Sequence, residues 1–355
     1  MTRDGNSADE DGGSGGPVDP EGDDPGGPGG DAGDADEGPG PGSHTHVPPE
    51  EAFGLLSNAT RVAILRALDD ARPAVPVSFT ELYDATDYDD SAGFNYHLRK
   101  LVPQFVRKVE PGARAGDEGA DASDGAEDTG YLLTAAGQRV VRAIEAGLYT
   151  VAATVPPVPV EGECTACGAA ALRGSYEDER FRFDCDACDT RILSVSAPPS
   201  LVVGRSPAEA MAAFDRWSQA GVDQAMDGIC PDCGGAVDAG IDGDPPPDLQ
   251  FAALPTFDCR VCGRTVYTSF GALATRNATV RSFHRDRGED LADRPYWAIP
   301  QCVTDEYTAV LGRDPWRVQV RFEADGDDCR ITFDGDLAVV AVEVDGEAVD
   351  VAPRE

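Results

Sequence analysis

Apolar residues recur at helical spacing in the segment that follows residue 48. In ATRVAILRAL they fall at Val62, Leu65 and Leu68, which predicts a helix with one buried face. EEAFGLL, SFTELYD and AAGQRVVRAIEAGLY are helical by the same criterion, as is a segment over 91–102, and 105–109 and 131–133 are strand-like. The predicted order is therefore three helices, a turn, a fourth helix, two strands and a last helix.

The fourth predicted helix buries Phe94, Leu98 and Leu101 and turns its other face outward. Residues 91–114 carry five basic residues and one acidic residue, a net charge of +4. The whole chain has 65 acidic and 29 basic residues, a net charge of −36, and both of its lysines lie in this stretch. The scarce basic residues are therefore concentrated where a helix would meet nucleic acid.

Asparagine can pair with adenine and arginine with guanine through two hydrogen bonds each, and basic side chains contact phosphates. For His97 two roles stay open, a phosphate contact or a cap on the helix face. The predicted DNA contacts are Ser91, Asn95, Tyr96, His97, Arg99, Lys100, Arg107 and Lys108.

Four segments in order, SNATRVAILRAL, FTELYDAT, FNYHLRKLV and YLLTAAGQRVVRAI, resemble the ArsR-type winged helix-turn-helix transcriptional regulators. The resemblance implies a DNA-binding winged helix-turn-helix over 49–150, with 91–102 as the helix that enters the major groove. ArsR-type metal sensors often carry cysteines near that helix or histidines in the last helix, and this chain has neither there. The wing over 116–130 holds six acidic and no basic residues, so we expect it to lie away from DNA or to be disordered.

Eight of the ten cysteines form four CxxC pairs, arranged as two copies of one repeat. The closing segments FRFDCDACDTRILSVS and PTFDCRVCGRTVYTS align, and each copy resembles a zinc ribbon. Four thiolates around a tetrahedral zinc ion leave no open position for a reacting water, so we predict two structural zinc ions. The pairing of the CxxC units between the two sites stays open, and a redox role is the alternative. The predicted ligands are Cys164, Cys167, Cys185, Cys188, Cys230, Cys233, Cys259 and Cys262.

The residue after each CxxC pair is glycine or aspartate, as expected where a turn needs positive φ. These residues are Gly168, Asp189, Gly234 and Gly263. Cys302 and Cys329 have no partner motif and are predicted to be buried small apolar residues.

A helix that begins with Ser206 and Glu209 as a capping box is predicted between the two copies. Its apolar face, with Met211, Phe214 and Trp217, needs a cover, and a thin ribbon has few apolar residues to spare. We expect a second copy of the chain to supply it through a two-fold axis. The alternative is packing against tail strands that carry Val318, Val320 and Phe322 on one side.

The predicted fold class is α+β multidomain: a winged helix-turn-helix, two zinc ribbons and a small antiparallel sheet. The expected parts are a disordered acidic tail (1–48), the winged helix (49–150), a Pro-rich linker (151–163), the ribbon region (164–274) and a small α+β domain (275–355). Asp-Gly turns at 325–326 and 334–335 mark a meander in the last part.

Composition argues against membrane, secreted and enzymatic classes of protein. No apolar stretch reaches the roughly 20 residues of a membrane span, and no secretory signal is visible, so we expect a cytoplasmic protein. The excess of acid, with arginine in place of lysine, is similar to the proteins of halophilic archaea. No arrangement of catalytic residues emerges, so we do not expect an enzyme.

The sequence therefore favours a sequence-specific regulator that binds double-stranded DNA as a homodimer. Winged helix followed by zinc ribbon also resembles archaeal transcription factor E, which makes a general factor associated with the transcription machinery the first alternative. A zinc or redox sensor is the second.

Overall fold

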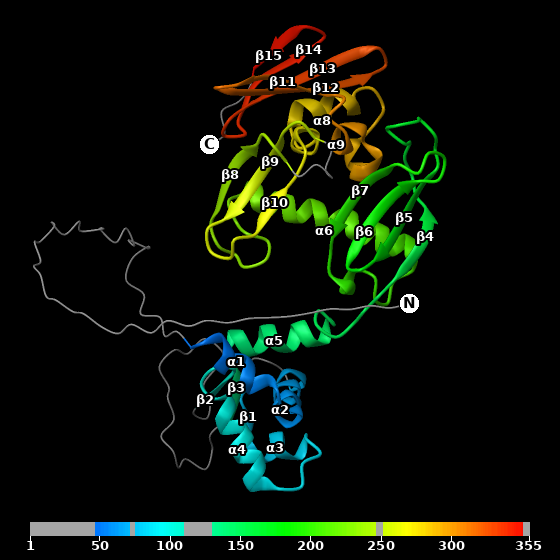
Figure 1. Ribbon diagram of the computed structural model, residues 1–355. Coiled ribbons are helices and arrows are strands. Elements are labelled where there is room, and N and C mark those ends of the chain that lie inside the picture. Colours follow the sequence, from blue (N-terminus) through cyan, green and yellow to red (C-terminus); the bar gives the residue numbers. More distant parts are fainter. Residues whose placement is uncertain (1–46, 72–74, 110–129, 246–250, 351–355) are drawn as a thin grey trace, which may run out of the picture. The chain divides into compact units, whose positions relative to one another are not determined.

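The computed structural model describes residues 47–71, 75–109, 130–245 and 251–350 (Figure 1). The predicted acidic tail, apart from its last two residues, and the predicted acidic wing, apart from Gly130, lie outside these ranges.

Helices dominate the N-terminal region, and one small sheet accompanies them. Strands β2 and β3 are antiparallel, and β1 pairs with the other edge of β3. The order of elements matches the predicted one, with β1 added. The elements are α1 (Pro49–Leu56), α2 (Ala59–Asp70), β1 (Val77–Ser78), α3 (Phe79–Asp84), α4 (Ser91–Leu101), β2 (Val106–Val109), β3 (Gly130–Leu133) and α5 (Ala135–Glu145).

Polar side chains fix where these helices begin. Asn58, Asp90 and Thr134 each accept a hydrogen bond from a backbone N–H in the first turn of the helix that follows. Ser78 and Glu81 form a reciprocal capping box at α3. The predicted stripe on α4 is buried, with Phe94, Leu98 and Leu101 all at zero exposure in a core shared with α2 and α5. Whether this arrangement is a winged helix-turn-helix remains a prediction.

Antiparallel sheets and one long helix make up the C-terminal region. The helices are α6 (Pro207–Met226), α7 (Phe270–Ala274), α8 (Ala278–Arg285) and α9 (Pro300–Val303), with short 3-10 turns η1 (Pro199–Leu201), η3 (Leu291–Asp293) and η4 (Tyr296–Ala298). The strands of the two ribbons are β4 (Val155–Pro159), β5 (Leu172–Glu177), β6 (Arg180–Cys185), β7 (Arg191–Ser196), β8 (Val237–Asp242), β9 (Leu254–Cys259) and β10 (Thr265–Tyr267).

Part of the predicted linker is a strand. Val155–Pro159 forms β4, which pairs with β5 at the edge of a four-stranded sheet in the order β4-β5-β6-β7. An edge strand tolerates proline because one side of it makes no ladder hydrogen bonds, and this explains why a Pro-rich segment joins the sheet. The second ribbon has three strands in the order β10-β9-β8.

The predicted meander is confirmed and is longer than the sequence indicated. Its five strands pair in chain order, with the inward residues of β12 buried and Arg317 and Gln319 half-buried on the other face. Asp325-Gly326 makes the predicted turn with both φ angles positive. The strands are β11 (Thr308–Arg313), β12 (Trp316–Ala324), β13 (Asp327–Asp334), β14 (Val339–Val344) and β15 (Glu347–Val349).

One hydrophobic core joins the first ribbon, α6, the second ribbon and the five-stranded sheet. The apolar face of α6 lies in it, with Phe214 stacked on Phe181 at 4.3 Å between ring centroids. Phe183 stacks in turn on Trp297, also at 4.3 Å. The first ribbon thus supplies apolar cover for α6, which the sequence left open between a ribbon, a second copy and the tail strands.

This packing changes the argument for a dimer. Met211 and Phe214 are covered within the chain, whereas Trp217 is 36% exposed. The apolar face therefore does not by itself require a second copy, and a homodimer stays a prediction. In the described part of the chain no helix combines the length and apolar character that a membrane crossing needs.

Candidate metal centres and nucleic-acid interface

The eight predicted cysteine ligands gather into two sets of four. Within each set the sulfur atoms lie within 4.8 Å of one another. The first set joins Cys164 and Cys167 before β5 to Cys185 and Cys188 at the end of β6. The second set joins the pairs that begin at Cys230 and Cys259 in the same way. Each site is therefore built inside one ribbon, which settles the pairing that the sequence left open.

Backbone hydrogen bonds give all four CxxC turns one shape. In each turn the N–H of the fourth residue after the first cysteine donates to that cysteine's carbonyl oxygen, as from Gly168 to Cys164 at 2.8 Å. The first cysteine's N–H donates to the carbonyl of the fifth residue, as from Cys230 to Gly235 at 2.8 Å. The residue after each pair has positive φ, between 57° at Asp189 and 76° at Gly234, as predicted. This conformation turns both sulfur atoms of a pair toward one point.

The sulfur spacing fits a tetrahedral ion. A metal–sulfur distance of about 2.3 Å requires sulfur atoms about 3.8 Å apart at tetrahedral angles. Cys164 and Cys188 are 3.7 Å apart, and Cys167 and Cys185 are 3.8 Å apart. In the second set the Cys230–Cys262 and Cys233–Cys259 distances are 3.7 and 3.5 Å. Each set is close enough to hold one metal ion.

Hydrogen bonds favour the thiolate form at one cysteine of each set, whereas the shared contacts with neighbouring thiols and burial raise the pKa of Cys167 and of Cys233 to about 12. The side chain and backbone of Thr190 lower the pKa of the Cys188 thiol to about 6. Backbone N–H groups of Cys262 and Val261 lower the pKa of Cys259 to about 6. Thr190 was not among the predicted site residues; a hydroxyl two residues after a cysteine is the signal that would have pointed to it.

The two remaining cysteines belong to the core. Cys302 is 7% exposed and Cys329 is at zero exposure. Burial raises the pKa of Cys302 to about 12 and that of Cys329 to about 11. Both are therefore protonated and inert at neutral pH, in agreement with the prediction of buried small apolar residues.

The predicted DNA contacts line the outer side of α4 and the strand that follows. Ser91, Tyr96, Arg99 and Lys100 are exposed, with Tyr96 at 57%, and the Lys100 ammonium lies 5.6 Å from the Tyr96 ring centroid. Among the described residues Arg99 and Lys100 form no ion pair with a carboxylate.

The other four predicted contacts are half-buried: Asn95, His97, Arg107 and Lys108. His97 lies between the rings of Tyr88 and Tyr96, at 5.9 and 5.4 Å, and its buried Nδ1 atom makes no hydrogen bond. This environment favours a packing role for the His97 ring over a phosphate contact.

Acidic residues flank the start of α4, just outside the segment 91–114 whose net charge is +4. Four aspartates lie within residues 84–90. The Asp90 carboxylate accepts hydrogen bonds from Ala92 and Gly93, 3.0 and 3.1 Å long, and so caps the helix. A charge count begun a few residues earlier would have revealed them. Because these acidic residues lie at the start of α4, the positively charged surface is confined to the C-terminal end of α4 and to β2.

Comparison with known families gives two matches. The family described as a domain of unknown function, DUF7351, matches residues 161–339, half of the chain. A second, DUF7347, matches residues 49–144. No curated protein and no solved structure matches the chain. The boundary between the two matched segments falls between the helical region and the first ribbon.

Proposed function

The chain belongs to the family of the domain of unknown function DUF7351, and for it we propose a DNA-binding transcriptional regulator with two structural zinc ions. The observation that carries the proposal is the outer side of α4, where Arg99 and Lys100 are exposed and form no ion pair with any residue that the structure describes. In a chain with a net charge of −36, two adjacent cations without an acidic partner suit a polyanion outside the chain.

The element order supports the same proposal. Helices α2, α3 and α4, the strand pair β2 and β3, and α5 follow one another as in a winged helix-turn-helix. Phe94, Leu98 and Leu101 bury one side of α4, which leaves the opposite side to enter a major groove. The acidic turn before α4 limits phosphate contact to Arg99 and Lys100, with Arg107 on β2 beside them.

Zinc is the ion that four thiolates in a closed tetrahedron suit best. Thiolate ligands favour zinc or iron among the metals of such sites, and zinc is held by four protein ligands where its role is structural. Because no position stays open for water or substrate, each ion would hold its ribbon together and take no part in catalysis. Elemental analysis of the protein, purified without chelator, should give two zinc ions per chain.

The DNA proposal is tested by titrating the full-length protein on specific and random duplexes over a range of potassium chloride concentrations. Replacing Arg99→Ala together with Lys100→Ala should weaken binding and reduce the salt slope by about two units, since each lost phosphate contact removes about 0.9. The matched control is Arg321→Ala with Arg330→Ala, which removes the same charge from the C-terminal sheet. Equal slopes for wild type and the α4 variant would contradict the proposal.

A general factor bound to the transcription machinery is the second candidate, and the acidic turn favours it. Asp87, Asp89 and Asp90 at the start of α4 oppose phosphate and suit a basic protein surface. Purification of the tagged protein with RNA polymerase, without footprints on DNA, would favour this candidate over a regulator.

A further inference from the structure

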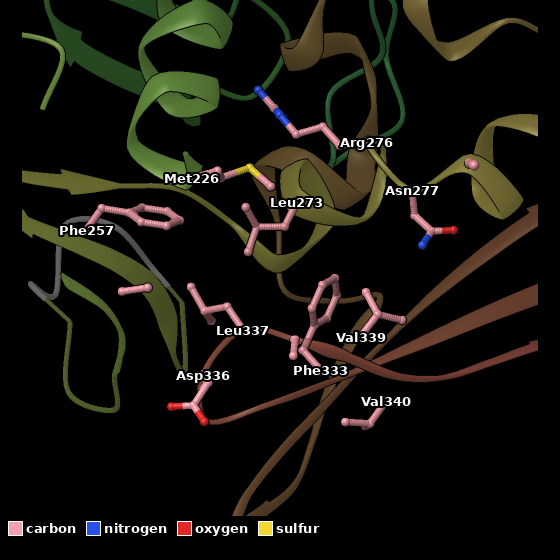
Figure 2. A pocket seen from close by; sticks show the side chains of 13 residues that line it. Met226, Phe257, Leu273, Arg276, Asn277, Phe333, Asp336, Leu337, Val339 and Val340 are labelled. Carbon is pink, nitrogen blue, oxygen red and sulfur yellow. The ribbon is translucent and has the colours of Figure 1, made fainter. Parts of the chain in front are cut away.

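A cavity of about 580 Å³ lies between the second ribbon and the C-terminal sheet (Figure 2). Its walls come from five places: the end of α6, strands β8 and β9, helix α7, the start of α8, and the turn from β13 to β14. The volume falls within the range of about 300–1,000 Å³ that is typical of small-molecule sites. Neither the metal sites nor the predicted DNA surface use these residues.

Apolar side chains converge on this space from several sides. Figure 2 shows Met226, Phe257, Leu273, Phe333 and Leu337 directed toward one another across it. Four of them are at most 5% exposed, although they border the cavity: Phe257, Leu273, Phe333 and Leu337. An apolar molecule seated in the cavity would therefore meet a largely apolar wall.

Leu337 is held in the cavity wall by a costly backbone conformation. Its φ is 59°, which is uncommon for a bulky residue and unfavourable for its backbone. The Asp334 carboxylate maintains the turn by accepting hydrogen bonds from the N–H groups of Asp336 and Ala338, at 3.0 and 2.9 Å. Strain of this kind gathers at ligand sites, because there a side chain must take one position.

The polar groups at the cavity limit the charge of the occupant. The Arg276 guanidinium is occupied by the Asp223 carboxylate and by the carbonyl oxygens of Ala272 and Gln219. Asp336, on the opposite wall, is exposed and carries a carboxylate. An anion would therefore meet one uncompensated negative charge and a cation that is already neutralised.

One polar group remains to orient a ligand. The Asn277 side-chain oxygen caps α8 by accepting from Thr279 and Val280, at 2.9 and 3.4 Å. Its amide nitrogen lies on the side of Phe333 and Val339 (Figure 2). It can donate to a carbonyl or ether oxygen.

We propose that this cavity binds a neutral, largely apolar small molecule with one hydrogen-bond acceptor. The occupant would bridge the second ribbon and the C-terminal sheet, whose residues line opposite walls. The proposal does not depend on DNA binding, so either can fail without the other.

The test compares two probes that share one aromatic skeleton. N-phenyl-1-naphthylamine is neutral, and 1-anilinonaphthalene-8-sulfonate is the same molecule with a negative charge. Fluorescence titration of the full chain in concentrated potassium chloride should show saturable binding of the neutral probe at one site per chain. The sulfonate should bind at least about tenfold more weakly, because among the described lining residues the one cation, Arg276, is already paired.

Two cavity-filling variants locate the binding. Ala239→Trp on β8 and Val340→Trp on β14 each place an indole at the wall, and both parent residues are exposed on strands. Each should weaken binding of the neutral probe at least about tenfold by occupying its space. Ala309→Trp on β11, an exposed strand residue away from the cavity, should leave affinity within about twofold.

The proposal is overturned if the neutral probe shows no saturable binding, or if the sulfonate binds as tightly. It is also overturned if a cavity variant with an unchanged far-ultraviolet circular dichroism spectrum binds the neutral probe like wild type. If one of the two variants fails to fold, the affinity of the other for the neutral probe decides whether the proposal stands.

Discussion

The cations on the outer side of α4 and several arginines elsewhere in the chain differ in their partners. In the C-terminal region Arg191 pairs with Asp184 at 2.8 Å and Arg287 with Asp327 at 2.7 Å, and in the helical region Arg66 pairs with Glu145 at 2.6 Å. On α4, Arg99 and Lys100 are exposed and make no ion pair with the described residues. In so acidic a chain, two adjacent cations on one exposed helix side are the feature on which the proposed contact with DNA rests.

The largest expected effect is that of removing metal, which should unfold the ribbons and leave the helical region folded. Removing zinc with a strong chelator should unfold the ribbon region, because binding of structural zinc contributes about 10–16 kcal/mol in small domains. All three tryptophans, Trp217, Trp297 and Trp316, lie in the C-terminal region, and Trp297 and Trp316 pack in the core that the ribbons share, so tryptophan fluorescence should shift to the red. Amide exchange in α2 and α4 should stay protected, since neither metal set found among the described residues includes a residue of the helical core. Tryptophan emission that is insensitive to chelation would contradict this account of the ribbons.

The next effect comes from the core of the ribbon region. Phe214→Ala should lower the free energy of unfolding by about 3–5 kcal/mol, since it opens a cavity against Phe181, Phe183 and Trp297. The matched control is Phe53→Ala on α1, where the ring is 71% exposed and the expected change is within about 0.5 kcal/mol. Urea unfolding followed by circular dichroism measures both. Equal losses in the two variants would show that burial does not distinguish these positions.

A smaller effect is expected on base recognition. Asn95→Ala on α4 should relax sequence preference at one base pair by about 1–3 kcal/mol. Affinity for random duplexes should stay unchanged, because the amide makes no phosphate contact in this account. Competition between duplexes that differ from a bound site by one base pair measures the change in sequence preference. A uniform loss on every sequence would reassign Asn95 to the phosphate backbone.

The smallest effect concerns the paired arginines. Arg321 contacts Glu323 at 3.1 Å and Arg330 contacts Asp328 at 2.6 Å, with all four side chains at least partly exposed. Replacing both arginines with alanine should change stability by about 0–1 kcal/mol per pair, because exposed ion pairs contribute little. Thermal unfolding at high and low salt measures the change. A loss of several kcal/mol would mean that surface pairing stabilises the ribbon region far more than expected.

Local features of the fold could be predicted from the sequence, because neighbouring residues determine them. The capping box of Ser206 and Glu209, the positive φ of Gly168 and the burial alternation of β12 all follow from patterns a few residues long. The ligand sets were predictable for the same reason, since CxxC turns are local and the closing segments repeat.

What the sequence did not reveal depends on contacts between distant segments. Trp297 lies more than a hundred residues from Phe183, and nothing near either residue indicates their stacking. The Trp297 indole N–H also donates to the carbonyl oxygen of Glu161, a residue of the predicted linker, at 3.1 Å. The cover of α6, the strand within the linker and the cavity beside β9 all arise from such packing.

Genome-wide occupancy of the tagged protein, with wild type beside the Arg99→Ala, Lys100→Ala variant, tests the central claim most directly. A DNA-binding regulator predicts discrete peaks that share a sequence and disappear in the variant. Occupancy that follows RNA polymerase at every active promoter, or that the variant leaves unchanged, would contradict the account.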